Sequence, residues 1–354
     1  MKLFTIGPVE MYPEQMEIGA KQVPYFRNQE FSEVSLDIMD MMKTALHADP
    51  DSEVILLTCS GTGAMESTVI NCFDKDDKVL VIDGGSFGHR FVQLLDLHNI
   101  PNCPVVIPRD HALTIDDLNA AAEEGLTALV VNLHETSTGQ LYDIKMLSDF
   151  CRDRNMLLIV DAISTFLADP LDMTEMGIDA VIVSSQKALA LAPGLSVITA
   201  SPRLLKRVSE INCQSMYLDW KSHIENGKRG QTPFTPAVRL FFELQNRLHI
   251  ILDEGVDACI NQCAESAKAF RARVKDLGLS YPAFPLSNAE TPVIFPDGID
   301  AHDVYQKLID EFGYVVNPSG GDLASRQFRV AHVGNNDVND FEALADAIQS
   351  VLKK

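Results

Sequence analysis

Short, almost wholly apolar segments recur along the first 200 residues of this chain, and segments of helical character separate them. Strands that are apolar on both sides are typical of a parallel sheet whose two faces are covered by helices, because such strands do not meet water. The alternation therefore predicts an α/β fold with a mainly parallel sheet flanked by helices. The expected strands span residues 54–58, 78–82, 104–107, 127–132, 156–161, 180–184 and 195–199, and the expected helices span 32–46, 64–73, 114–124 and 143–155.

The pattern changes near residue 250, where one long helical segment leads into shorter strands and helices. A chain of 354 residues is long enough for two lobes, since domains usually hold about 100–200 residues. We expect a small-molecule site in the cleft between them. The expected organisation is an N-terminal arm (1–15), a large domain (16–250) and a smaller C-terminal α+β domain (251–354), the last with helices over 255–277, 301–312 and 337–352 and strands over 291–295 and 327–332.

Charge and composition exclude several classes of protein. The chain has 29 Lys and Arg against 50 Asp and Glu, a net charge of −21, which repels nucleic acid and anionic membranes. It has no tract of about 18 apolar residues that could span a bilayer, and its first residues lack a signal-peptide pattern, so we expect a cytoplasmic protein. Seven scattered cysteines without a C-x-x-C pair predict neither a disulfide framework nor a metal site. An anionic ligand would need cations placed locally.

A glycine-rich turn, Ser60-Gly61-Thr62-Gly63, follows one expected strand and leads into a helix. Its backbone N–H groups, its two hydroxyls and the positive end of the helix could together bind a phosphate. The turn is not a dinucleotide fingerprint, because Glu66 stands where the third glycine is required, and no G-K-[ST] follows to make a P-loop. Taken alone, it is equally well explained as a plain turn with a helix cap.

Two charged residues follow neighbouring apolar strands. Asp161 ends one strand, and a buried carboxylate needs a partner such as a protonated ring nitrogen, although a lone Asp more often caps a helix. Lys187 follows the next strand, and apolar surroundings lower the pKa of a lysine so that it becomes a nucleophile toward aldehydes, whereas a surface lysine is the default. Ser184-x-x-Lys187 also fits serine acyl-enzymes, but their S-D-N and K-T-G elements are absent.

Together these features resemble the class V aminotransferases of pyridoxal-phosphate (PLP) fold type I, especially the alanine–glyoxylate, serine–pyruvate and 2-aminoethylphosphonate–pyruvate group. The resemblance covers nearly the whole chain. It implies that PLP is the cofactor, that Lys187 binds it covalently as a Schiff base, and that Asp161 contacts its ring nitrogen. It also implies that the turn over residues 60–63 binds its phosphate.

Further motifs extend this resemblance to the cofactor ring. Phe87, in a G-x-F-G-x-R turn, would stack on the ring where many relatives have Trp. Thr136 would place a hydroxyl near the phenolic oxygen of the cofactor, with Ser137 as the alternative. Gln186 precedes the lysine where cysteine desulfurases usually have His, which favours transamination.

The resemblance also implies residues for the substrate and for a partner subunit. Arg329 would bind the substrate α-carboxylate, and Gly7 and Pro8 would line the substrate pocket. Thr232 and Thr235 lie in a segment that would reach the cofactor phosphate of a neighbouring subunit, which implies a homodimer with shared active sites.

The implied reaction moves an amino group from a small amino acid, of the alanine or serine type, to a 2-oxo acid such as glyoxylate or pyruvate. The alternatives are a 2-aminoethylphosphonate–pyruvate transaminase and a PLP lyase or desulfurase of the same fold. Arg27 and Arg229 are available to bind a phosphonate, but either could equally be a surface residue.

Overall fold

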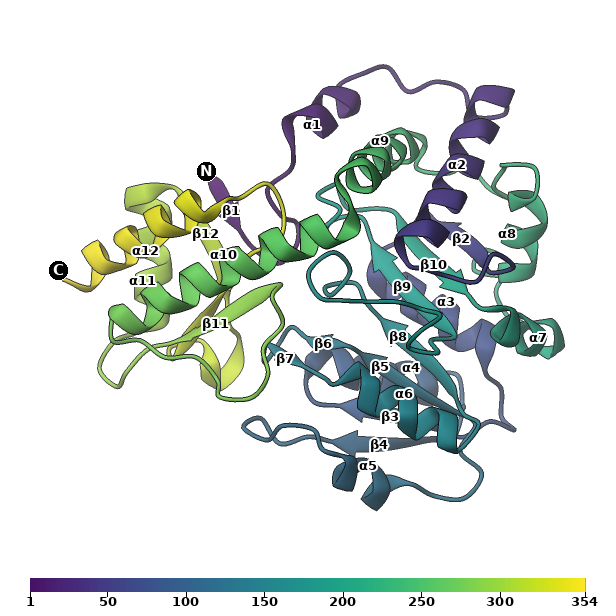
Figure 1. The fold of residues 1–354 in the computed structure, drawn as a ribbon, viewed down its shortest axis with the longest axis horizontal. Coiled ribbons are helices and arrows are strands. Elements are labelled where there is room, and N and C mark those ends of the chain that lie inside the picture. The colour runs from purple at the N-terminus through teal and green to yellow at the C-terminus, as the bar shows by residue number, and fades with distance from the viewer. Residues whose placement is uncertain (354) are drawn as a thin grey trace.

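The computed structural model describes residues 1–353, and its larger lobe is built on a seven-stranded sheet (Figure 1). The antiparallel strand β10 lies between β2 and β9, and the remaining neighbours are parallel, which confirms the mainly parallel sheet. In spatial order the strands are β2 (Glu53–Leu57), β10 (Ser196–Ala200), β9 (Ala180–Ser184), β8 (Leu157–Asp161), β5 (Ala128–Asn132), β3 (Val79–Asp83) and β4 (Asn102–Val106).

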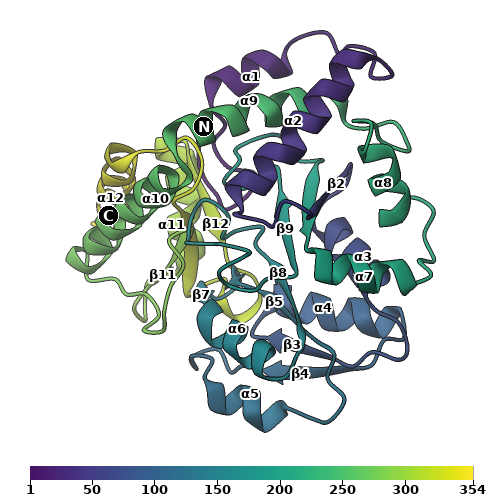
Figure 2. The same cartoon turned by 45° about the vertical axis from the view of Figure 1, so that its right-hand side comes forward.

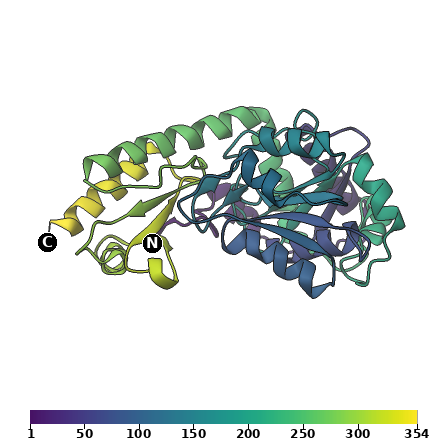
Figure 3. The same ribbon diagram turned by 90° about the horizontal axis from the view of Figure 1, so that it is seen from below.

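Helices cover both faces of this sheet, as the apolar strands require (Figure 3). Alternate residues of one strand enter different cores: Leu129 and Val131 pack on one face, while Ala128 and Val130 pack on the other. The first face carries α2 (Gln29–Ala45), α5 (Ile115–Ala121), α6 (Ile144–Asp153) and α9 (Val238–Glu254), and the second carries α3 (Gly61–Cys72), α4 (Ser86–Leu97), α7 (Pro202–Glu210) and α8 (Trp220–Gly227).

The smaller lobe is built on a four-stranded sheet in the order β1-β12-β13-β11 (Figure 2). Its core joins Phe4, Phe270 and Phe341, which come from the start, middle and end of the lobe. The strands are β1 (Lys2–Phe4), β11 (Glu290–Ile294), β12 (Tyr314–Pro318) and β13 (Gln327–Ala331), and the helices are α10 (Val256–Asp276), α11 (Ala301–Lys307) and α12 (Val338–Leu352), with single turns at Leu308–Phe312 and Gly321–Leu323.

The first strand, β1, pairs in parallel with β12, so the chain begins in the small lobe before it crosses to the large one. The crossing segment carries α1 (Pro13–Gly19), and a two-stranded ribbon of β6 (His134–Glu135) and β7 (Gln140–Leu141) lies where the lobes meet. The domain boundaries expected at residues 15 and 250 stay predictions. No helix within residues 1–353 combines the length and apolar character needed to cross a membrane.

Five helices were not expected from the sequence, namely α1, α4, α7, α8 and α9. Residues 85–90 were expected to form a turn, but α4 begins at Ser86, so Phe87 lies in the first turn of a helix. Three of them, α1, α4 and α9, have no side-chain N-cap, and without that local signal the start of a helix is hard to recognise. The other two were missed although Ser201 caps α7 and Asp219 caps α8. The first N–H groups of α4 are instead satisfied by side chains that are distant in the sequence.

Candidate active site

The carboxyl ends of β8 and β9 meet the start of α3 at one buried hollow, which we call the lysine cavity. Its volume is about 150 Å³. It brings together eight of the residues predicted from the sequence: Ser60, Gly61, Thr62, Phe87, Thr136, Asp161, Gln186 and Lys187. Met65, Arg90, Asn132, His134, Ile163 and Ser164 complete the lining. Ligands of open α/β sheets bind at this edge, because the strand ends and helix starts converge there.

Lys187 and Asp161 are the two charged groups at the strand ends. Burial lowers the pKa of the Lys187 amine, while the carboxylates of Glu290 and Asp161 oppose that shift. A lowered pKa leaves more of the amine unprotonated and therefore nucleophilic.

The Asp161 side chain is a buried carboxylate without an ion-pair partner among residues 1–353. It is only 6% exposed, and it accepts a hydrogen bond from the backbone N–H of Ile163 at 2.8 Å. Burial raises the pKa of Asp161 to about 7, although that hydrogen bond and the charge of Lys187 both lower it. A protonated ring nitrogen beside Asp161 would supply the missing charge, so this residue fits a pyridine cofactor.

Gly61 and Gly63 lie in the first turn of α3, where added side chains would meet close neighbours. A Cβ atom on Gly61 would lie 2.6 Å from Cδ1 of Ile163, and one on Gly63 would lie 2.9 Å from Cβ of Cys59. Ser60 caps α3 by accepting a hydrogen bond from the N–H of Gly63 at 3.3 Å. Gly63 itself does not line the lysine cavity, and its contact with the cofactor stays a prediction.

Arg90 is a site residue that the sequence analysis did not single out. Its Nη1 donates to the Thr62 hydroxyl at 3.0 Å, and its guanidinium carbon lies 4.9 Å from the centre of the Phe87 ring. It therefore adds a cation beside the phosphate turn of an acidic protein. The arginine closes the G-x-F-G-x-R motif, which was the available signal.

Glu135 joins two walls of the site and was also missed. One carboxylate oxygen accepts hydrogen bonds from the N–H groups of Phe87 at 3.2 Å and Gly88 at 2.9 Å, and from the Asn132 amide at 3.1 Å. The other accepts from the N–H of Ser137 at 3.0 Å and its hydroxyl at 2.5 Å. The Ser137 hydroxyl is thus hydrogen-bonded to Glu135, whereas Thr136 lines the lysine cavity.

The N-terminal segment lies directly against the lysine. A Cβ atom on Gly7 would be 2.8 Å from Cδ of Lys187, so no larger residue fits without moving that side chain. The following Pro8 is exposed. The N–H of Val9 donates to the carbonyl of Gln186 at 3.3 Å and holds the segment in place.

Arg329 reaches the site from β13 of the small lobe. Its Nη1 donates to the carbonyl of Thr136 and lies 3.9 Å from Oε2 of Glu290. Glu290 is fully buried, and its Oε1 lies 3.5 Å from Nε2 of His134, which is equally buried. Within residues 1–353 neither oxygen of Glu290 has a hydrogen-bond donor. Glu290 has no signal in the sequence, because its partners come from other parts of the chain.

Four further residues named from the sequence, which come from two other loops, also lie outside the lysine cavity. Thr232 donates its hydroxyl to the carbonyl of Phe234 at 2.7 Å, and Thr235 lines a separate hollow beside residues 23–26. Arg27 donates to the carbonyl of Thr232 at 2.6 Å, so it supports this loop. Arg229 donates to the side chain of Asn226 at 2.7 Å.

Comparison with known proteins places this geometry in a family. Residues 23–329 match the family model described as "Aminotransferase class-V". The "Soluble hydrogenase, small subunit" of Synechococcus sp. is 29% identical over 99% of this chain and 92% of its own length. The 2-aminoethylphosphonate–pyruvate transaminase of Vibrio vulnificus is 29% identical over 90% of each chain. The solved aspartate aminotransferase of subgroup IV from Thermus thermophilus superposes with a TM-score of 0.92 at 27% identity, over 100% of this chain and 99% of that one.

Proposed function

The chain belongs to the class-V aminotransferase family, and we propose that it moves the amino group of an amino acid such as alanine or serine to glyoxylate or pyruvate. Membership makes it a PLP-dependent transaminase of fold type I. One observation carries the proposal: Asp161 ends β8, Lys187 lies three residues beyond the end of the neighbouring strand β9, and both line the same cavity. A nucleophilic amine and a carboxylate short of a cation are the two groups that a pyridine aldehyde cofactor requires.

PLP, when bound, supplies an electron sink for the bonds around the substrate Cα. Lys187 would hold the cofactor and then move a proton at that carbon, a task for which an amine of lowered pKa is suited. Asp161 would keep the ring nitrogen protonated, and Phe87 would lie against the ring. Ser60, Thr62 and the N–H of Gly61 would bind the phosphate. The hydroxyl of Thr136 would contact the phenolic oxygen.

Residues of the small lobe and of the N-terminal segment would orient the substrate. A guanidinium matches a carboxylate with two parallel hydrogen bonds, so Arg329 is suited to the α-carboxylate. Its position beside the carbonyl of Thr136 puts it next to the lysine cavity. Gly7 lies against Lys187, and with Pro8 it would line the same pocket.

A homodimer with shared active sites is part of the proposal. Thr232 and Thr235 do not line the lysine cavity of their own chain, which is consistent with a role at the phosphate of a partner subunit. Mixing a Lys187→Ala subunit with a Thr232→Ala, Thr235→Ala subunit tests it. Each hybrid dimer has one intact site of its two, so we expect it to recover about half the activity of a wild-type dimer. The cytoplasmic location and the division at residues 15 and 250 also remain proposals.

A screen of half-reactions tests the proposed chemistry. Single amino donors are added to the PLP-loaded enzyme, and the absorbance of the lysine-bound cofactor is followed as it gives way to that of pyridoxamine phosphate. Conversion by alanine or serine, followed by recovery with glyoxylate or pyruvate, supports transamination. Pyruvate release from serine or cysteine without an acceptor indicates a lyase or a desulfurase. 2-Aminoethylphosphonate is the second candidate donor, because the relative from Vibrio vulnificus bears that name.

A further inference from the structure

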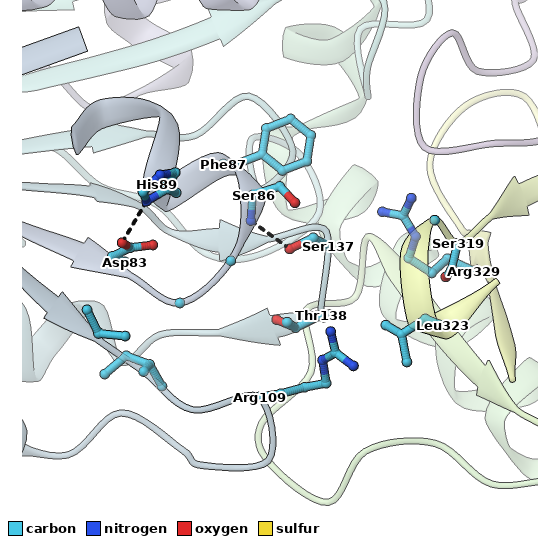
Figure 4. Close-up of a pocket in the computed structure, with 15 residues that line it drawn as sticks. Asp83, Ser86, Phe87, His89, Arg109, Ser137, Thr138, Ser319, Leu323 and Arg329 are labelled. Atoms are coloured by element: carbon cyan, nitrogen blue, oxygen red, sulfur yellow. Dashed lines mark hydrogen bonds and ion pairs between the residues drawn. The ribbon is translucent and has the colours of Figure 1, made fainter. Parts of the chain in front are cut away.

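A second and larger hollow, which we call the outer cavity, lies where the two lobes face each other (Figure 4). Its volume of about 710 Å³ is in the range of about 300–1,000 Å³ found for small-molecule sites. The ends of β3 and β4, the segment at Ser137 and Thr138, and the small-lobe segment around Ser319 form its walls.

The outer cavity adjoins the lysine cavity. Phe87 lines both of them. Arg329 lines the outer cavity and donates to the carbonyl of Thr136, which lines the lysine cavity. A substrate that reacts at Lys187 while Arg329 binds its α-carboxylate would therefore have the outer cavity available for its side chain.

The charges around the outer cavity are mostly positive, although the protein as a whole carries −21. Two arginines, Arg109 and Arg329, and a single acid, Asp83, line it, and Asp83 already lies 2.9 Å from Nδ1 of His89. Figure 4 shows Arg109 beside Thr138 on the large-lobe side and Arg329 with Ser319 on the other. Among residues 1–353, the exposed Arg109 side chain has no hydrogen-bond or ion-pair partner.

The nearby helix end does not compete for an anion. The N–H of Ser86 donates to the hydroxyl of Ser137, and the N–H of Gly88 donates to Glu135. These N–H groups at the start of α4 therefore already have acceptors. Arg109 is left as the group on the large-lobe side that can bind an anion strongly.

We propose that the outer cavity is a second anion subsite, in which Arg109 binds an acidic group at the end of the donor side chain while Arg329 binds the α-carboxylate. The donor would then be an amino acid with two acidic groups, either a dicarboxylic or a phosphorylated one. The methyl group of alanine would leave most of the 710 Å³ to water and Arg109 without a partner. This inference rests on the proposed transamination and extends its donor from neutral to acidic amino acids.

Paired donors of similar size test the subsite in the PLP-loaded enzyme. We expect aspartate to exceed asparagine, and phosphoserine to exceed serine, by about tenfold or more in kcat/KM of the half-reaction. The two acids distinguish a carboxylate from a phosphate subsite. 2-Aminoethylphosphonate carries only one acidic group, so it cannot bind both arginines and should not gain this advantage in kcat/KM.

Arg109→Gln should reduce the preference for the acidic member of each pair by about tenfold. Arg326→Gln is the matched control, because Arg326 is an exposed arginine that does not line the outer cavity. It should leave the preference unchanged. A preference that survives in Arg109→Gln overturns the assignment of this residue.

Equilibrium binding separates the subsite from turnover. Enzyme reduced with borohydride cannot react, so its affinity for succinate and for propionate can be measured by calorimetry. We expect tighter binding of succinate, by about tenfold, and loss of that difference in Arg109→Gln. Equal affinities would overturn the subsite. If no donor converts the cofactor, the proposed transamination fails, whereas conversion by alanine but not by aspartate defeats only the subsite.

Discussion

Glu290 and His134 are fully buried and come from different lobes, and Oε1 of the acid lies 3.5 Å from Nε2 of the imidazole. The other oxygen of Glu290 lies 3.9 Å from Nη1 of Arg329. The Glu290 carboxylate thus lies next to Arg329, which we propose binds the substrate α-carboxylate. Its negative charge also raises the pKa of Lys187. Glu290 is therefore placed to influence both groups without occupying the cavity itself.

Glu290→Gln should make Lys187 nucleophilic at lower pH. Burial lowers the pKa of this amine, and the negative charge of Glu290 is the strongest influence that opposes the shift. Loss of the charge therefore lowers the pKa further. The rate at which apoenzyme takes up PLP, measured against pH, should rise at lower pH in the variant. Glu342→Gln, in a pair with Arg273 elsewhere in the small lobe, is the control and should match the wild type.

Asp161→Asn should stabilise the apoenzyme while it removes activity. The folded-state pKa of Asp161 is raised to about 7 from a usual value of 3.8, so the folded protein binds the proton more tightly than the unfolded chain does. Stability of the wild type should consequently fall as pH rises from about 4 to 7, by at most roughly 4 kcal/mol. Urea unfolding at pH 8 should show a more stable variant, and below pH 4 the difference should vanish.

The same Asp161→Asn variant should transaminate about a hundredfold more slowly, because the ring nitrogen loses its ionised partner. Unchanged turnover would contradict the role given to this carboxylate. Unchanged stability at pH 8 would instead contradict its raised pKa. The two measurements therefore test separate parts of the account.

Glu135→Ala should cost about 2–4 kcal/mol of unfolding free energy, because it leaves several buried donors, including the N–H groups of Phe87 and Gly88, without an acceptor. PLP should also bind more weakly, since Glu135 no longer holds together the segment that carries Phe87 and the segment that carries Thr136 and Ser137. Urea unfolding and titration of apoenzyme with PLP measure the two effects. Glu123→Ala, which removes an exposed acid paired with Lys78, should change neither by more than about 0.5 kcal/mol.

Gly7→Ala should impair activity and also cost some stability. The new Cβ would lie 2.8 Å from Cδ of Lys187, and the flexible lysine side chain can move aside, but the φ of +158° at Gly7 is one that residues with a Cβ rarely adopt. The amine of Lys187 would then be displaced from the cofactor and the substrate. We expect kcat to fall about tenfold or more, while the unfolding free energy falls by about 1–3 kcal/mol. An unchanged kcat in the folded variant would contradict the role given to this contact.

Much of the large lobe could be predicted because its signals are local. Each buried strand is apolar over its whole length, and the strand-end rule then brings Asp161 and Lys187 to one edge. The helices α1, α4 and α9 were missed because they lack side-chain caps, whereas α7 and α8 were missed although they have them. Glu135, His134 and Glu290 were missed because their partners are set by packing between distant segments, which spacing along the chain does not reveal.

The proposed function depends on a covalent bond between the amine of Lys187 and the cofactor. PLP-loaded enzyme is reduced with borohydride, digested, and mapped by mass spectrometry, with Lys187→Arg treated in parallel. We predict one pyridoxyl group per chain, on Lys187, and none in the variant. A pyridoxyl group on a different lysine, or a wild-type enzyme that remains unlabelled after loading, would contradict the account.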